Sequence, residues 1–135
     1  HGAVKSIDDV MHYNLFHLAE RGVWPGLAVI DGFESMEGHC PAWGTPLATR
    51  LALASRDPLA ADIVGTTIMG FDPARILYLK AMADAGMGQG ELAKIEIVGA
   101  RLEECRFKFK VHKEMADIYG LTDRVGAANA PQEGA

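Results

Sequence analysis

The stretch LATRLALASRDPLAADIVGTTIMG, residues 47–70, decides the fold, because an apolar strand pattern leads directly into an apolar helix pattern. Leu47–Ser55 is a short apolar run with a single charge, which is typical of a strand. Asp57 and Pro58 then supply the N-cap and first-turn residues of a helix, and Gly70 ends it. A strand that leads straight into a helix favours an α/β domain.

The rest of the chain continues this alternation of helix and strand patterns. Further helices are predicted over Ser6–Gly22, Asp72–Gly86 and Val111–Gly120, and further strands over Leu27–Ile30 and Lys94–Val98. We therefore expect an α/β fold with a small, mixed sheet of three or four strands covered by helices. So small a sheet fits one part of a larger α/β fold.

The predicted boundaries divide the chain into one domain and a tail. Residues 1–120 are expected to form a single α/β domain. Because the sequence begins HGAVKS, without an initiator methionine, we interpret this domain as the C-terminal part of a longer protein. Residues 121–135 have no apolar period and are expected to be a flexible tail. Within the domain, RLEECRFKFK (101–110) fits either an edge strand or an extended arm.

Composition and charge exclude several classes of function. With 49% apolar and 23% charged residues, the chain is typical of a globular protein. A net charge of −5 provides no basic field, so we expect no nucleic-acid partner. No apolar run reaches about 18 residues, so we expect no membrane span. Cys40 and Cys105 are too few for a disulfide scaffold, which favours a reducing, cytoplasmic location.

The connection IDGFESMEGHCPAWGTP, residues 30–46, concentrates reactive side chains between two strands. Asp31 ends the first strand, where the sites of α/β sheets gather, although Asp-Gly is also an ordinary turn signal. Glu37, His39 and Cys40 carry metal-binding side chains, but their spacing matches no standard zinc pattern. Glycines here would let backbone amides approach an anion. The alternative is a structured surface loop, with the cysteine as a small apolar filler.

Two aspartates belong to the helix that follows. Asp57 is explained largely as an N-cap. Asp62 lies among apolar residues of a helix that is expected to be buried, and an ionised side chain there needs a partner. Either Arg50 or Arg56 forms an ion pair with it, or Asp62 faces a polar pocket. The later GMGQG, residues 86–90, follows a helix and is interpreted as a C-cap and turn.

Three separated blocks share the order and spacing of a family pattern. They are LAVIDGFESMEGHCPAWGTP (27–46), LALASRDPLAADIVGTTIMGFDP (51–73) and AMADAGMGQGELAKIEIVG (81–99). Over Leu15–Gly99 the chain resembles the C-terminal half of an uncharacterised family, domain of unknown function family 362. Its members often occur fused to, or encoded beside, ferredoxin-type iron–sulfur domains. The resemblance therefore implies a redox-associated role, a ferredoxin-type domain or protein as partner, and a missing N-terminal half.

The same resemblance selects particular positions of this chain. The acidic, glycine and proline positions of the family fall on Asp31, Glu37, Gly38, Pro41, Gly44, Asp57 and Asp62. Where the family has a second glycine, this chain has Cys40, which removes a flexible backbone position or adds a thiol. We assign cofactor binding to four of these positions, Gly38, Pro41, Gly44 and Asp57.

The first hypothesis is an acidic pocket whose cofactor is unknown. Asp31, Glu37 and Asp62 would act as acid–base groups. Asp31, Glu37 and His39 would hold a divalent metal. An iron–sulfur cluster would come only from the missing domain or a partner, because this chain has no cluster-binding run of cysteines. If this hypothesis holds, at least three of Asp31, Glu37, Asp57 and Asp62 should converge.

The second hypothesis is a non-catalytic module for docking or scaffolding. The chain would complete a sheet with its missing N-terminal half or with another subunit of an iron–sulfur-linked protein. In this case Asp57 is only a cap and Asp62 pairs with an arginine. The expected signature is an exposed apolar surface or an unpaired strand edge.

Overall fold

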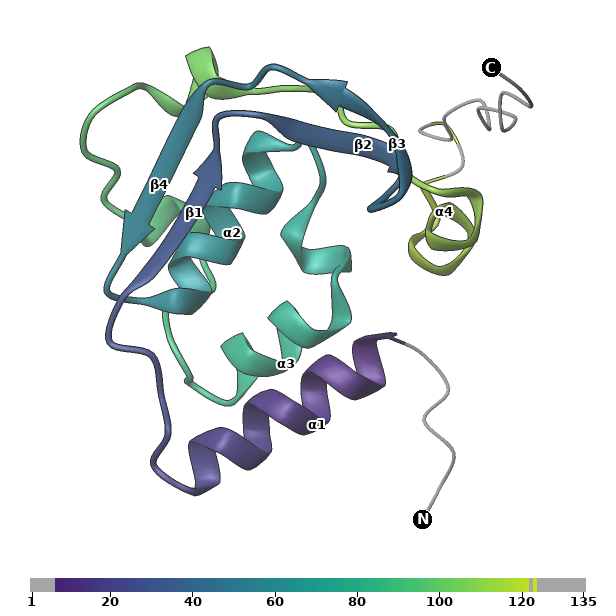
Figure 1. Ribbon diagram of the computed structural model, residues 1–135. Helices are drawn as coiled ribbons and strands as arrows, with labels where there is room; N and C mark the ends of the chain where they lie inside the picture. Colours follow the sequence, from purple (N-terminus) through teal and green to yellow (C-terminus); the bar gives the residue numbers. More distant parts are fainter. Residues whose placement is uncertain (1–6, 122, 124–135) are drawn as a thin grey trace.

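The computed structural model describes residues 7–121 and residue 123, and it confirms the predicted α/β class (Figure 1). The elements, with η denoting 3-10 helices, are α1 (Ile7–Glu20), β1 (Ala28–Gly32), β2 (Ser35–His39), β3 (Trp43–Leu47), β4 (Leu51–Ser55), α2 (Pro58–Ile68), η1 (Pro73–Arg75), α3 (Leu77–Asp84), η2 (Leu92–Lys94), η3 (Leu102–Cys105) and α4 (Lys113–Tyr119). The predicted tail, residues 121–135, lies almost wholly outside the described residues.

The four strands form two antiparallel ribbons that follow one another. β1 pairs with β4 in a register that places Asp31 opposite Ala52, and β2 pairs with β3. Between the ribbons, the amide of Arg50 donates to the carbonyl oxygen of Phe33 at 2.9 Å. The connection predicted over residues 30–46 is therefore mostly a β-hairpin, which extends beyond the end of β1 and the start of β4 (Figure 1).

This hairpin was not predicted, because its strands contain glycine and proline, which are rare inside strands. Gly44 lies opposite Gly38, and Pro46 lies opposite Met36. At Gly44 the partner strand comes so close that an added Cβ would lie 2.7 Å from the carbonyl oxygen of Glu37. Gly44 is thus required by a close approach of two strands, and its cofactor-binding role stays a prediction.

One face of the β1–β4 ribbon packs against α2 (Figure 1). Along both strands the more buried residues alternate with exposed ones, as expected for a sheet with one covered face. Ile30 on the covered face lies against Gly65 of α2, where an added Cβ would be 3.4 Å from the Ile30 Cδ1 atom. Val29, Ala52 and Ala54 occupy the uncovered face.

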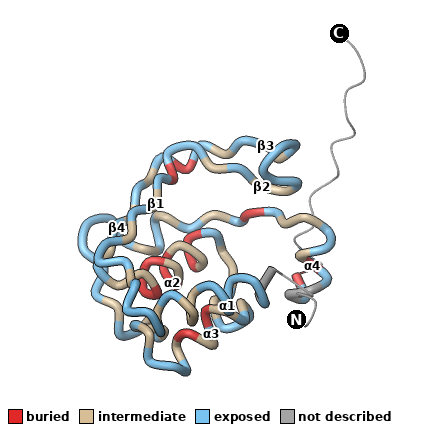
Figure 2. Tube along the Cα trace, turned by 60° about the horizontal axis from the view of Figure 1, so that its bottom comes forward, coloured by how far each residue is buried: buried red, intermediate tan, exposed pale blue. Residues whose placement is uncertain are grey.

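The main core lies between α2 and α3. Leu59, Ile63, Leu79 and Met82 form its buried centre, and residues of α1 and the loop after α3 pack around it. Figure 2 shows buried segments on α2 and α3 beside the mostly exposed strands. Burial of a leucine such as Leu59, which is fully buried, stabilises the fold by roughly 2–3 kcal/mol.

The strand predicted over Lys94–Val98 is wrong. Lys94 ends η2, and residues 95–98 follow without pairing to any strand in the described part of the chain. Ile97 and Val98 are exposed, Val98 by 86%. The β-forming pattern is present, but a strand also needs a neighbouring edge, and the pattern does not provide one.

The helix predicted over Asp72–Gly86 is divided in two. Asp72 caps η1 through its side chain, but Ile76 is extended (φ −92°, ψ 109°) and α3 begins only after it. Ile76 packs against both buried clusters of the protein, so tertiary packing overrides the continuous helical pattern.

Of the two alternatives for residues 101–110, the extended arm is observed. After η3, the amides of Phe107 and Phe109 donate to the carbonyl oxygens of Ile68 and Met69 at the end of α2. The arm then reaches β2, where Gly38 forms an isolated parallel bridge with Val111. Among the described residues, no helix is long and apolar enough to cross a membrane.

Candidate functional site

A cavity of about 390 Å³ lies between the β1–β4 ribbon and α2, and we name it the Asp62 cavity. Its lining combines acidic and hydroxyl side chains with apolar walls, which is the usual composition of a small-molecule site. The polar lining residues are Asp31, Glu34, Ser35, Thr49, Asp62, Thr66 and Tyr78. The larger apolar ones are Ile30, Met36, Leu51, Leu53, Ile68, Met69 and Phe109.

Helical periodicity explains why Asp62 reaches this cavity. Asp62, Gly65, Thr66 and Met69 lie three or four positions apart and share one face of α2. That face is half-buried or exposed, whereas Leu59, Ala60, Ala61, Ile63 and Val64 are buried. The helix therefore packs on all other sides and leaves its polar stripe to the cavity.

Asp62 has few protein partners. The Tyr78 hydroxyl donates to its Oδ2 atom over a long 3.5 Å. No ion pair of Asp62 is present in the part of the chain that the structure describes, so the predicted pairing with Arg50 or Arg56 is not formed. Burial raises the pKa of the Asp62 carboxyl above its usual range, and the Tyr78 hydrogen bond offsets part of this shift.

Two hydroxyls hold the cavity wall where the ribbons meet. The Thr49 hydroxyl donates to the carbonyl oxygen of Gly32, and the Ser35 and Thr49 oxygens are 2.6 Å apart. Thr49 is buried. Ser35, Thr49 and Tyr78 could not be identified from the sequence, because a hydroxyl residue carries no local signal of the cavity that it lines.

Asp31 borders the same cavity, but its surroundings differ from those of Asp62. It is exposed and alternates along β1 with Ile30, so it shares the uncovered face with Val29. Its Oδ1 atom accepts the amide hydrogen of Phe33 at 3.0 Å, which is the local bond of an Asx turn. A turn role for Asp31 is therefore present in the structure, and its acid–base role stays a prediction.

Glu37 is used to join the hairpin to the arm. Its Oε2 atom accepts the amide hydrogen of Lys110 at 2.8 Å, and its Oε1 atom lies 3.6 Å from the Lys110 ammonium nitrogen. The Gly38 amide donates to the Lys110 carbonyl oxygen in return. Only 11% of the Glu37 side chain is exposed. Glu37 and Gly38 thus have structural partners in the arm, away from the Asp62 cavity.

Asp57 binds two backbone amides at once. Its Oδ1 atom accepts from Ala60 at 3.1 Å as the N-cap of α2, and its Oδ2 atom accepts from Gln89 at 2.7 Å. Gly88 lies so close to this carboxylate that an added Cβ would overlap it. Residues 86–90 therefore do more than the predicted C-cap and turn, because they are fastened to the start of α2.

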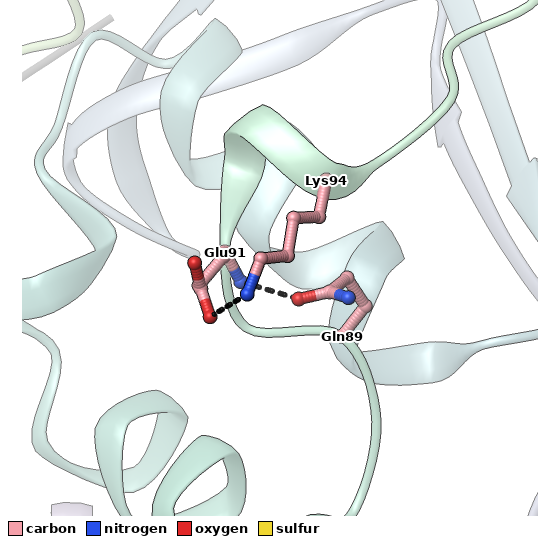
Figure 3. Close-up of polar contacts among 3 residues, drawn as sticks. All are labelled: Gln89, Glu91 and Lys94. Carbon is pink, nitrogen blue, oxygen red and sulfur yellow. Dashed lines mark hydrogen bonds and ion pairs between the residues drawn. The ribbon is translucent and has the colours of Figure 1, made fainter.

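Figure 3 shows how this loop continues beyond Gln89. The Gln89 side-chain oxygen accepts the amide hydrogen of Glu91 at 3.0 Å, and Lys94 pairs with the Glu91 carboxylate at 2.6 Å. The ion pair is exposed and contributes little energy, about 0–1 kcal/mol for such pairs. These contacts shape the loop.

The end of the hairpin gathers aromatic and imidazole rings. His39 and His112 have ring centroids 4.4 Å apart, and Trp43 lies 5.7 Å from His39. Burial and the Glu37 carboxylate raise the pKa of the neighbouring Cys40 thiol, which disfavours its reactive thiolate form. Pro41 follows in the exposed turn. The cofactor role of this turn stays a prediction.

The structure does not gather the four candidate carboxylates. Asp31 and Asp62 border one cavity, whereas Glu37 and Asp57 are bonded elsewhere. Over residues 7–121 and 123, no three histidine, cysteine, aspartate or glutamate side chains are placed to hold a metal ion. The predicted set of Asp31, Glu37 and His39 is thus not assembled here, and metal binding stays a prediction.

About half of the chain is similar to known proteins. A relative from Synechocystis sp. (strain ATCC 27184 / PCC 6803 / Kazusa), thylakoid-associated protein sll1697, is 36% identical over 67 residues. Those residues are 50% of this chain and 21% of that protein, so the match spans about a fifth of the relative. No solved structure shows a significant match. Residues 3–67, which contain Asp31, Glu37, Asp57 and Asp62, match the family described as Domain of unknown function (DUF362).

Proposed function

We propose that this chain contributes a small-molecule site in which Asp62 is the polar anchor. The observation that carries the proposal is a half-buried carboxylate that faces a cavity and has a single, long hydrogen bond among the described residues. A ligand with an amine or hydroxyl group would donate to Asp62, while Ile30, Leu53 and Phe109 would contact its apolar part.

The energetics of α2 support this role. Placing a carboxylate on an otherwise apolar helix costs stability unless its charge is compensated. Caps and ion pairs compensate Asp57 and Glu37, but the structure offers Asp62 only Tyr78. A carboxylate that has little compensation from the protein, a raised pKa and a place on a cavity is a functional-site candidate.

The raised pKa suits Asp62 to proton transfer. A raised pKa moves a carboxyl group from a permanently ionised anion toward a group that can both give up and accept a proton. The Tyr78 hydroxyl and the Thr66 hydroxyl lie on the same cavity and would orient the ligand. A redox-associated reaction and a ferredoxin-type partner are implied only by the family resemblance, and they remain part of this proposal.

Ligand-induced stabilisation tests the proposed site. We expect ethanolamine and 1,3-diaminopropane, at millimolar concentration, to raise the melting temperature of the wild-type protein, with ethylene glycol as the uncharged comparison. The Asp62→Asn variant should lose the amine response, whereas Asp84→Asn, which changes an exposed aspartate of α3, should keep it. Equal amine responses in the two variants would contradict the proposal.

A docking module is the second candidate, and the uncovered face of the β1–β4 ribbon favours it. Val29 is 65% exposed and lies opposite Ala54, Ala52 lies on the same face, and Leu27, just before β1, is 61% exposed. In the described residues each strand of this ribbon has one partner strand, so its outer edge is unpaired. An apolar face and an open edge are features that other polypeptides recognise.

A further inference from the structure

A second cavity of about 390 Å³ runs along β4, and we name it the β4-edge cavity. It is lined by every residue from Arg50 to Ser55, by Ile95–Val98, and by small residues of α2. The Asp62 cavity, in contrast, touches β4 only at Leu51 and Leu53.

This difference identifies which part of β4 each cavity borders. Successive side chains of a strand point to opposite faces, so a cavity over one face meets alternate residues. Leu51 and Leu53 fit that pattern. A cavity that meets six consecutive residues instead lies beside the strand, along its hydrogen-bonding edge. β1 already occupies one edge of β4, so the β4-edge cavity lies along the other.

The wall of the cavity that faces β4 is also an extended run of consecutive residues. Ile95, Glu96, Ile97 and Val98 are consecutive, and they lie in a segment that pairs with no strand in the described structure. The floor is formed by Ala60, Ala61 and Val64 of α2, whose short side chains leave room above the helix. The cavity is therefore open along a strand edge and apolar underneath.

We propose that the β4-edge cavity receives one extended strand from the polypeptide that lies outside this chain in a longer protein. The strand hydrogen-bonds to the free edge of β4 and turns apolar side chains toward α2. This addition converts the β1–β4 ribbon into a three-stranded sheet. It is β-augmentation, in which backbone hydrogen bonds bind the added strand and side-chain pockets select it.

The relative supports this choice of occupant. About four-fifths of thylakoid-associated protein sll1697 lies outside its match to this chain. Residues 3–67, which match the family, include β1, β4 and most of α2. Two-stranded ribbons are marginally stable by themselves, and three or more strands are the usual minimum for a sheet. The apolar floor selects a strand rich in valine, isoleucine or leucine, because these residues suit a half-buried pleated surface.

This inference does not depend on the ligand of the Asp62 cavity, because the α2 residues that carry the two proposals differ, although Ile68 borders both cavities. Ala60, Ala61 and Val64 line the β4-edge cavity, whereas Asp62, Gly65 and Thr66 line the Asp62 cavity. Failure of amine binding would leave the strand proposal standing, and the reverse also holds.

Site-specific photo-crosslinking in the protein as its organism makes it tests the inference. A benzoylphenylalanine replaces Ala54, which lines the β4-edge cavity and is exposed, and Ala52 serves as a second position if the first variant does not fold. Ala85, exposed after α3, is the control position. Crosslinked peptides are identified by mass spectrometry.

The expected product joins β4 to an apolar segment of the same polypeptide that lies outside residues 1–135, at several-fold higher yield than at the control position. Three outcomes would overturn the proposal. They are a crosslink confined to residues 1–135, a crosslink to a separate protein or second copy, and a natural polypeptide that contains no further segment.

Discussion

Asp57 caps α2 and Asp62 lies within it, five positions later, but the hydrogen-bond partners of the two carboxylates differ. Asp57 accepts two backbone amides, one from each of its oxygens, and so joins α2 to the loop at residues 86–90. Asp62 accepts one long bond from a tyrosine hydroxyl and faces a cavity. Both aspartates lie in the stretch that matches the family, so the match alone does not separate their roles.

The comparison teaches that the donors around a carboxylate indicate its role. Backbone amides that fill both oxygens make Asp57 a structural residue, whose loss should be measured as lost stability. A carboxylate with few donors and a raised pKa is available to a ligand, and its loss should change pH dependence more than stability. Variants of the two aspartates and of their neighbours should therefore behave differently.

The largest loss of stability is expected from a change at Gly88, which packs directly against the Asp57 carboxylate. Gly88→Ala should destabilise the protein by about 2–3 kcal/mol, because Gly88 has φ 149° and an added Cβ would overlap the Asp57 carboxylate. Gly86→Ala is the matched control, since its φ of 68° is also left-handed but its Cβ site is empty. Urea unfolding measures both, and equal losses would show that the contact with Asp57 does not matter.

Removal of the Asp57 carboxylate comes next. Asp57→Ala should cost about 1–2 kcal/mol, because it removes the N-cap of α2 and the bond to the Gln89 amide. Asp72→Ala removes a single exposed cap bond and should cost less. Chemical denaturation of the two variants checks the order, and the reverse order would show that the Gln89 contact contributes nothing.

Much of the fold could be predicted from the sequence, because local chemistry determines it. Asp57 and Pro58 start α2 through contacts with residues only a few positions away in sequence. The strand predicted over Leu27–Ile30 largely overlaps β1. The failed predictions concern features that need a distant partner. Lys94–Val98 has a strand pattern without a strand to pair with, and Ile76 leaves the helix to pack between two clusters.

The candidate site could be predicted only in part. Asp62 was identified because a charged residue inside an apolar helix conflicts with its surroundings, and this conflict is visible in the sequence. Tyr78 could not be found in this way, because it lies sixteen residues away and reaches Asp62 only through tertiary folding. Glu37 was selected for its neighbours in sequence, yet its partner is Lys110, which only the folded arm brings close.

A smaller effect is expected at Asp62 itself. Because burial raises its pKa in the folded protein, its contribution to stability is full below about pH 4 and is lost as the pH rises through the raised pKa. Asp62→Asn cannot ionise, so it should equal the wild type near pH 3 and become more stable at neutral pH. The gain in unfolding free energy should be less than about 1 kcal/mol, since solvent screens a half-buried group. Unfolding free energies from pH 3 to 8 measure it.

Asp84→Asn is the control for this pH series, because Asp84 is an exposed aspartate whose partner, Lys80, lies on the surface. It should not reproduce the growing gain in stability. If Asp62→Asn is instead destabilised at neutral pH by more than at pH 3, the ionised carboxylate has a protein partner that compensates it, and the contrast with Asp57 fails.

The smallest effect is expected from Tyr78→Phe, which sharpens the contrast by removing the hydroxyl that donates to Asp62. A hydrogen bond of 3.5 Å is weak, so stability should change by no more than about 0.5 kcal/mol. The informative quantity is the pKa of Asp62. The Tyr78 bond lowers that pKa against the effect of burial, so its removal should raise the pKa further. A carbon-detected NMR titration of the Asp62 carboxyl measures the change. A pKa that falls or stays constant would mean that Tyr78 does not stabilise the ionised form, and that burial alone prepares Asp62 for a ligand.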